Sequence, residues 1–147
     1  MIIEDIITNS TEETEAIGGS LSAKILSDKS LPRFVALYGD LGVGKTAFVR
    51  GFTADIAPNA LVRSPTFALV NEYKGNDLSV FHFDLYRIED EDSLYSIGFY
   101  DYFDRRGICI TEWTENIEYA LPDSYFRVKI EKLPDNVDKR HVLIELI

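Results

Sequence analysis

The residues with the clearest chemical potential form a glycine-rich segment, G-D-L-G-V-G-K-T, over positions 39–46. It matches the pattern G-x-x-x-x-G-K-[ST], in which the glycines let successive backbone amides turn toward one anion. Lys45 would reach the β- and γ-phosphates of a nucleotide, and the hydroxyl of Thr46 would hold Mg²⁺. The alternative is a turn that only connects a strand to a helix, but such a turn does not need Lys followed by Thr. We therefore predict a phosphate-binding loop.

A metal beside such a loop needs a second carboxylate, usually at the end of another buried strand. Residues 108–112 read I-C-I-T-E, so an apolar strand leads directly to Glu112. Because the acid is Glu and not the commoner Asp, contact with Mg²⁺ through a water molecule is one option. The alternative is a solvated acid at a strand end. Cys109 is more simply interpreted as a small core residue than as a reactive thiol.

Positions 82–87, H-F-D-L-Y-R, alternate in the manner of a strand. His82 and Asp84 share one face, and the apolar side chains beside them share the other. Asp84 could orient an attacking water or hold metal, and the positive charge of Arg87 could neutralise negative charge on a phosphate. Alternatively, Asp84 and Arg87 form a structural ion pair at a strand end.

The segment S-P-T-F at positions 64–67 is polar where an ordinary loop would not need to be. Its hydroxyls could sense the γ-phosphate as part of a mobile switch. Alternatively, Ser-Pro starts a turn and Phe67 begins a strand. The pattern does not choose between the two interpretations.

The elements that must position these residues follow from apolar periodicity. Ser10 and Glu13 have the spacing of a capping box, in which the Ser10 hydroxyl accepts from the Glu13 amide and the Glu13 carboxylate accepts from the Ser10 amide. We expect a helix after Ser10, a second helix over 45–56 closed by Pro58, and a short helix over 90–98. Strands are expected over 2–7, 33–38, 67–73, 78–83, 107–113, 126–130 and 141–147, with a hairpin joining the third and fourth. This order predicts one α/β domain over 1–147, a three-layer P-loop NTPase-like fold with a mixed parallel and antiparallel sheet.

Composition sets limits on the function. The chain has 147 residues and a net charge of −10, so autonomous nucleic-acid binding is disfavoured because phosphate contacts need Lys and Arg. No apolar run approaches the length of a membrane helix, and the N-terminus carries acids where a secretory signal would carry Lys or Arg. The single cysteine excludes an internal disulfide and a cysteine-cluster metal site. These features predict a cytoplasmic protein without a membrane association.

Two surface-type segments have both structural and functional interpretations. Positions 98–106 place four aromatic residues among charges, which is more typical of core and rim than of a ligand cage. Positions 88–104 hold six acids and neither Lys nor Arg, which favours a solvated face over a docking site. An exposed aromatic cluster here would be a partner surface.

The type of NTPase is narrowed by what the sequence lacks. It contains no N-K-x-D guanine signature, which disfavours a GTPase. A small-molecule kinase would need an acceptor site and an arginine-rich lid, for which 147 residues leave little room. A nucleotide-gated interaction module, in which hydrolysis is incidental, stays open.

Together the motifs resemble the bacterial tRNA threonylcarbamoyladenosine biosynthesis ATPase family, the TsaE (YjeE) type. The matching pieces, in family order and spacing, are the loop at 39–46, V-R-G at 49–51, S-P-T-F at 64–67, L-V-N-E-Y at 69–73, H-F-D-L-Y-R at 82–87 and I-T-E-W at 110–113. The resemblance implies an ATP-binding protein with weak ATPase activity alone. It also implies work with the two-subunit TsaB–TsaD synthase, which would hold the tRNA, so that this chain meets tRNA only indirectly.

The resemblance also implies roles for individual residues. Lys45 and Glu112 would be catalytic, and Thr46 and Glu112 would hold Mg²⁺. We add Asp84 to the catalytic residues on our own hypothesis that it is the water-orienting carboxylate. Ala47 stands where the family often has a second Thr. The residues implied to bind ATP or ADP are Thr11, Asp40, Leu41, Gly42, Val43, Gly44, Lys45, Thr46, Ala47, Thr66 and Trp113.

Overall fold

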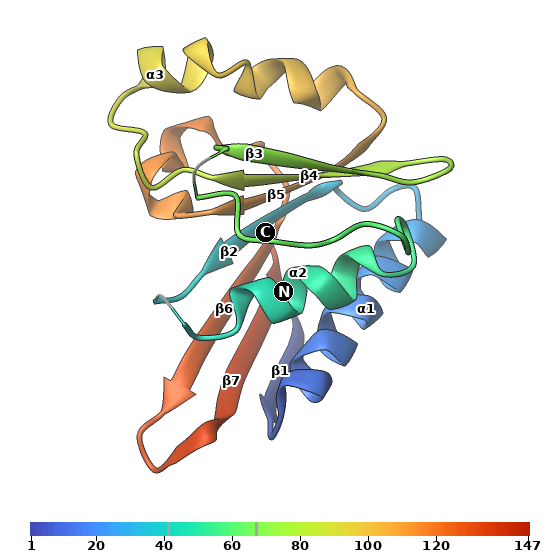
Figure 1. The fold of residues 1–147 in the computed structure, drawn as a ribbon, viewed down its shortest axis with the longest axis vertical. Coiled ribbons are helices and arrows are strands. Elements are labelled where there is room, and N and C mark those ends of the chain that lie inside the picture. The colour runs from blue at the N-terminus through green and yellow to red at the C-terminus, as the bar shows by residue number, and fades with distance from the viewer. Residues whose placement is uncertain (41, 67) are drawn as a thin grey trace.

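The apolar runs of the sequence form a seven-stranded sheet with the order β1-β7-β6-β2-β5-β4-β3 (Figure 1). The computed structural model describes residues 1–40, 42–66 and 68–147. The strands are β1 (Ile2–Thr8), β2 (Phe34–Tyr38), β3 (Val70–Lys74), β4 (Ser79–Asp84), β5 (Gly107–Glu112), β6 (Phe126–Leu133) and β7 (Asn136–Leu146).

Helices cover both faces of the sheet, which confirms the predicted three-layer α/β fold. Helices α1 (Thr11–Ser27) and α2 (Lys45–Thr53) lie side by side on one face, and α3 (Glu91–Ser96) with the 3-10 helix η1 (Phe99–Asp104) covers the other (Figure 1). Two further 3-10 turns, η2 (Thr114–Asn116) and η3 (Glu118–Ala120), follow β5. In the described ranges, no helix has the length and apolar character needed to cross a lipid bilayer.

The sheet is mixed, as the sequence predicts. Strand β2 pairs in parallel with both β5 and β6, and β4 pairs in parallel with β5. The pairs β3–β4, β6–β7 and β1–β7 are antiparallel. Because β2, β4 and β5 run the same way, their carboxyl ends meet at one edge of the sheet. Ligands of open α/β sheets bind at this kind of edge.

Each face of the sheet has its own apolar core. Phe48 and Phe52 of α2 pack with Val35 and Leu37 of β2 on the first face. On the second face, Phe99 of η1 is fully buried and meets the Phe83 ring edge-on, with the centroids 5.1 Å apart. The structural interpretation of positions 98–106 is thus confirmed for Phe99.

Three local expectations are corrected by the structure. The Ser10 hydroxyl accepts from the Glu13 amide at 3.2 Å as predicted, but the Glu13 carboxylate accepts from the Asn9 amide, not from Ser10. Helix α2 ends at Thr53 and not at 56, because the Thr53 carbonyl accepts from both Ile56 and Ala57 in a closing turn. Strand β3 begins at Val70 and so leaves out the predicted strand residues Ala68 and Leu69, because their amides donate to the Pro65 carbonyl oxygen in a turn.

Candidate functional site

The glycine-rich loop lies between the carboxyl end of β2 and the start of α2, as its pattern requires. Gly39, Gly42 and Gly44 have positive φ angles of 147°, 77° and 108°, a region that L side chains rarely adopt. Gly44 is the N-cap residue of α2. The loop therefore needs these glycines for its backbone path, and the helix N-terminus behind it favours an anion.

Lys45 lies at the mouth of the loop and is only 6% exposed. Its ammonium donates to the Gly39 carbonyl oxygen at 2.7 Å and lies 3.8 Å from a Glu112 carboxylate oxygen. The same ammonium lies 5.2 Å from the ring centroid of Trp113. The structure thus brings together the loop lysine, the predicted metal carboxylate and the predicted Trp113 contact.

The two predicted carboxylates lie on adjacent strands. In the parallel register of β4 and β5, Asp84 is paired with Glu112, and both residues are 5% exposed. One Asp84 carboxylate oxygen accepts from the Tyr86 amide at 3.0 Å. Among the described side chains no ion pair joins Asp84 to Arg87, which is exposed. The structural alternative for Asp84, a strand-end ion pair, is therefore not formed.

Glu112 has a second partner that the sequence patterns did not assign. The fully buried His82 lies with its Nε2 atom 2.5 Å from a Glu112 carboxylate oxygen. Its Nδ1 atom lies 3.2 Å from the Tyr73 hydroxyl. The alternation of positions 82–87 placed His82 and Asp84 on one face, and this much is confirmed. The partners of His82 could not be predicted because they depend on strand order.

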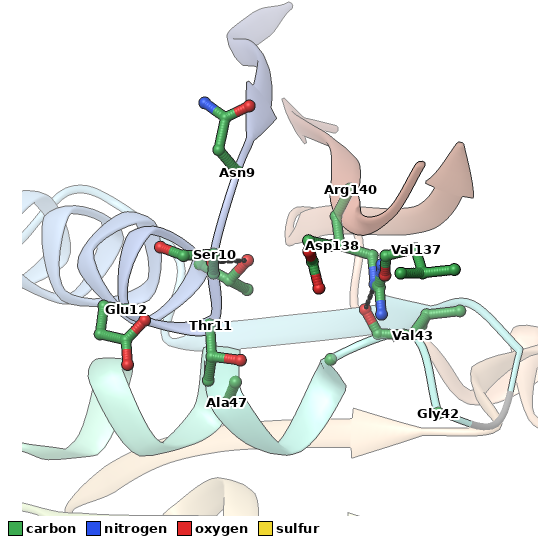
Figure 2. Close-up of a pocket in the computed structure, with 12 residues that line it drawn as sticks. Asn9, Ser10, Thr11, Glu12, Gly42, Val43, Ala47, Val137, Asp138 and Arg140 are labelled. Carbon is green, nitrogen blue, oxygen red and sulfur yellow. Dashed lines mark hydrogen bonds between the residues drawn. The ribbon is translucent and has the colours of Figure 1, made fainter. Parts of the chain in front are cut away.

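A cavity of about 470 Å³ opens beside the loop. It lies between the start of α1, the loop and the β6–β7 hairpin (Figure 2). Arg140 of β7 closes one side, where its Nε atom donates to the Val43 carbonyl oxygen at 2.8 Å (Figure 2). Arg140 was missed by sequence reasoning because it carries no motif. The predicted nucleotide contacts that line this cavity are Thr11, Gly42, Val43, Gly44 and Ala47.

The remaining predicted residues lie elsewhere. Asp40 is exposed and lines a second hollow together with Val43 and Lys132. Thr46 is half-buried in the first turn of α2. Thr66 is exposed, and its hydroxyl lies 2.8 Å from that of Ser64. Predictions for Leu41 and Phe67 fall outside the described residues.

The half-buried Trp113 follows Glu112 with a φ angle of 59°, a left-handed conformation that is uncommon for a bulky residue. Its ring packs against Tyr86, with the centroids 4.8 Å apart. Cys109 lies on β5 inside the second core, and burial raises the pKa of its thiol to about 12. Its interpretation as a core residue agrees with this environment.

The mixed sheet, the loop after β2 and the buried lysine define a protein of the P-loop class. Comparison with known proteins gives the particular family. The family model described as "Threonylcarbamoyl adenosine biosynthesis protein TsaE" matches residues 8–142, and the chain belongs to this family.

Individual relatives agree with this assignment. The Bacillus subtilis (strain 168) protein "tRNA threonylcarbamoyladenosine biosynthesis protein TsaE" is 38% identical over 136 residues, which cover 92% of this chain and 80% of the relative. The Haemophilus influenzae protein of the same name is 39% identical over 112 residues, covering 76% of this chain and 70% of the relative. A solved structure, "Crystal structure of Bacillus subtilus YdiB", superposes with a TM-score of 0.76 at 30% identity, covering 98% of this chain and 86% of that one.

Proposed function

We propose that this chain is a weak Mg²⁺-dependent ATPase that acts with TsaB- and TsaD-type proteins in the threonylcarbamoyladenosine modification of tRNA. The observation that carries the proposal is the pairing of Lys45 with Glu112, 3.8 Å apart, at the mouth of the glycine-rich loop. A cation for phosphate and an anion for a metal lie in one site. The family's pathway, given in the names of its members, supports the tRNA-modification role.

The available ligand atoms fit Mg²⁺, which prefers oxygen ligands and is usually held by one or two carboxylates with substrate phosphates. The Thr46 hydroxyl and the Glu112 carboxylate would hold it, and Asp84 lies on the neighbouring strand end. Among the described residues, no group of three or more His, Cys, Asp or Glu side chains could hold a metal alone. When bound, Mg²⁺ would neutralise charge on the phosphates.

The chain's own residues would divide the work between binding and turnover. The loop amides and the Lys45 ammonium bind the phosphates and stabilise negative charge that builds up on them. Asp84 is the carboxylate that orients the attacking water, since it is buried beside Glu112 without an ion-pair partner among the described side chains. Thr66 contacts the γ-phosphate from the switch segment.

The cavity beside the loop is the place proposed for the nucleoside of ATP or ADP. Its volume of about 470 Å³ lies within the usual range for ligand pockets of roughly 300–1,000 Å³. Thr11 lines it from the start of α1, and Arg140 ties its far wall to the loop. Trp113 lies at the other end of the site, next to Lys45.

The net charge of −10 supports the division of labour with partners. An acidic chain has little electrostatic attraction for the tRNA backbone. The TsaB–TsaD pair would therefore hold the tRNA, and this chain would contact the partners.

The experiment that tests the proposal is phosphate release from Mg-ATP, with and without the purified TsaB–TsaD pair. Lys45→Ala serves as the blank. We expect slow release alone and strong stimulation by the pair. Equal slow rates in both conditions would contradict the partner-dependent ATPase and favour the nucleotide-gated module. Phosphate appearing on an acceptor molecule would instead indicate a kinase.

A further inference from the structure

His82 is a polar side chain in an environment that offers almost no solvent. It is fully buried on β4, and both of its ring nitrogens have partners. The Glu112 carboxylate only accepts hydrogen bonds, so the Nε2 atom of His82 is the donor across the 2.5 Å contact. A buried imidazole held at both nitrogens has one orientation, and it fixes the carboxylate that it contacts.

The second nitrogen of His82 leads away from the carboxylates. The Tyr73 hydroxyl lies 3.2 Å from Nδ1 and 2.9 Å from the Arg63 carbonyl oxygen, and it accepts from the Arg63 amide at 3.2 Å. It has a single proton, which it donates either to Nδ1 or to that carbonyl oxygen. The Asn71 side-chain amide donates to the same carbonyl at 3.2 Å. The backbone of Arg63 is thus held by β3, directly before the segment that contains Ser64 and Thr66.

The sheet topology makes this chain of contacts possible. Strands β3, β4 and β5 are neighbours at one edge of the sheet (Figure 1). Tyr73 pairs with Val80, and His82 pairs with Ile110, so the two polar side chains project from the face that packs on α1 and α2. Glu112 continues the same face one step beyond Ile110. The contacts cross three strands, from the carboxylate of Glu112 to the backbone of Arg63.

A histidine with a purely structural role in the core would need hydrogen-bond partners for its ring nitrogens, but any polar groups could serve. Here one partner is the carboxylate assigned to Mg²⁺, and the other leads to the segment assigned to the γ-phosphate. Partners of metal ligands of this kind orient the ligand, and losing them typically weakens metal affinity or activity by about 10- to 100-fold.

We propose that His82 is a positioning residue that, through Tyr73, couples the orientation of Glu112 to the backbone at Arg63 and so to the Ser64–Thr66 segment. This inference rests on the proposed function, because it assigns Glu112 to the metal. Mg²⁺ at Glu112 and the arrangement of the segment are then two readouts of one hydrogen-bonded network.

The test uses the full chain and two readouts that do not depend on turnover. Trp113 is the only tryptophan and directly follows Glu112, so its fluorescence reports Mg²⁺ binding to the ADP complex. The amide resonance of Arg63 reports the backbone conformation directly before the Ser64–Thr66 segment. Tyr73→Phe removes only the hydroxyl and keeps the buried ring. Tyr102→Phe is the matched control, because Tyr102 packs on the opposite face of the same sheet. Thermal unfolding verifies that both variants fold.

We expect Tyr73→Phe to leave metal-free ADP affinity unchanged, to weaken Mg²⁺ affinity about 10-fold, and to abolish the response of the Arg63 amide to Mg²⁺. Tyr102→Phe should match the wild type in all three. His82→Gln is a second variant: its amide nitrogen can replace Nε2 as the donor to Glu112, but it leaves no polar atom at the position of Nδ1, which lies next to Tyr73. It should lose the Arg63 response while losing less Mg²⁺ affinity than His82→Ala.

Two results would overturn the inference. Wild-type Mg²⁺ affinity in Tyr73→Phe would show that the hydroxyl does not position Glu112. An Arg63 amide that still responds to Mg²⁺ in that variant would break the proposed link. If the wild type itself bound neither ADP nor Mg²⁺, the proposed function would fail first and the inference with it, an outcome distinguished by the absence of any wild-type signal.

Discussion

The ammonium of Lys45 donates a 2.7 Å hydrogen bond to the carbonyl oxygen of Gly39, the residue that opens the glycine-rich loop. The side chain therefore bridges the two ends of the loop. An ammonium has three donor hydrogens, so Lys45 can keep this bond and still donate to a phosphate. The contact fixes the direction of the Lys45 side chain within the loop.

Lys45→Ala should weaken ADP binding by about 10- to 100-fold, since a hydrogen bond to a charged group contributes about 1.5–3 kcal/mol. Isothermal titration calorimetry measures the affinity directly. Lys24→Ala is the control, because Lys24 is an exposed lysine in the last turn of α1. Unchanged ADP affinity in a folded Lys45→Ala protein would show that Lys45 does not bind the phosphates of ADP and would contradict the assignment of the loop.

Asp84→Asn should lower the rate of ATP hydrolysis by about 100-fold or more, the usual effect of losing a general base, and leave ADP affinity unchanged. The amide oxygen of Asn can still accept from the Tyr86 amide, so the local turn is kept. Steady-state phosphate release measures the hydrolysis rate, and calorimetry measures the ADP affinity. A parallel loss of ADP affinity would instead make Asp84 a binding or structural residue.

Gly51→Ala should destabilise the fold by separating α1 from α2. A Cβ atom at this position would lie 1.8 Å from the Glu15 carbonyl oxygen, which is backbone and cannot rotate away. Overpacking of this kind typically costs about 1–3 kcal/mol, which lowers the melting temperature by several degrees. Gly19→Ala is the matched control on the same helix pair, since its nearest neighbour would lie at 3.4 Å. Equal melting temperatures for the two variants would contradict the close helix crossing.

The Cys109 thiol should resist labelling by Ellman's reagent at pH 8 in the folded protein and react once denaturant unfolds it. Burial raises the pKa of this thiol to about 12, whereas its pKa in an unfolded chain is about 8.5. Its contribution to stability is therefore complete below the unfolded pKa and is lost as pH rises toward about 12, because only the unfolded chain releases the proton. Rapid labelling under native conditions would show that β5 opens. Cys109→Ala is the blank for the unfolded signal.

Features that depend on neighbours along the chain could be predicted from the sequence. The glycine-rich loop belongs to this group, because its backbone path needs glycine at three positive φ angles and a helix directly afterwards. The alternation that places His82 and Asp84 on one face does too, because strand geometry alone sets it. The capping box was correct only in part: Asn9 and Ser10 both offer an amide to Glu13, and the spacing does not distinguish them.

The partnerships that make the site depend on tertiary structure. Asp84 meets Glu112, and His82 reaches Glu112 and Tyr73, only because β3, β4 and β5 are neighbours in a particular register. Arg140 closes the cavity by bonding to Val43, 97 residues away along the chain. Residue types and spacing determine which groups can donate, accept or turn. Strand order and register, which follow from the packing of the whole sheet, decide which of them meet.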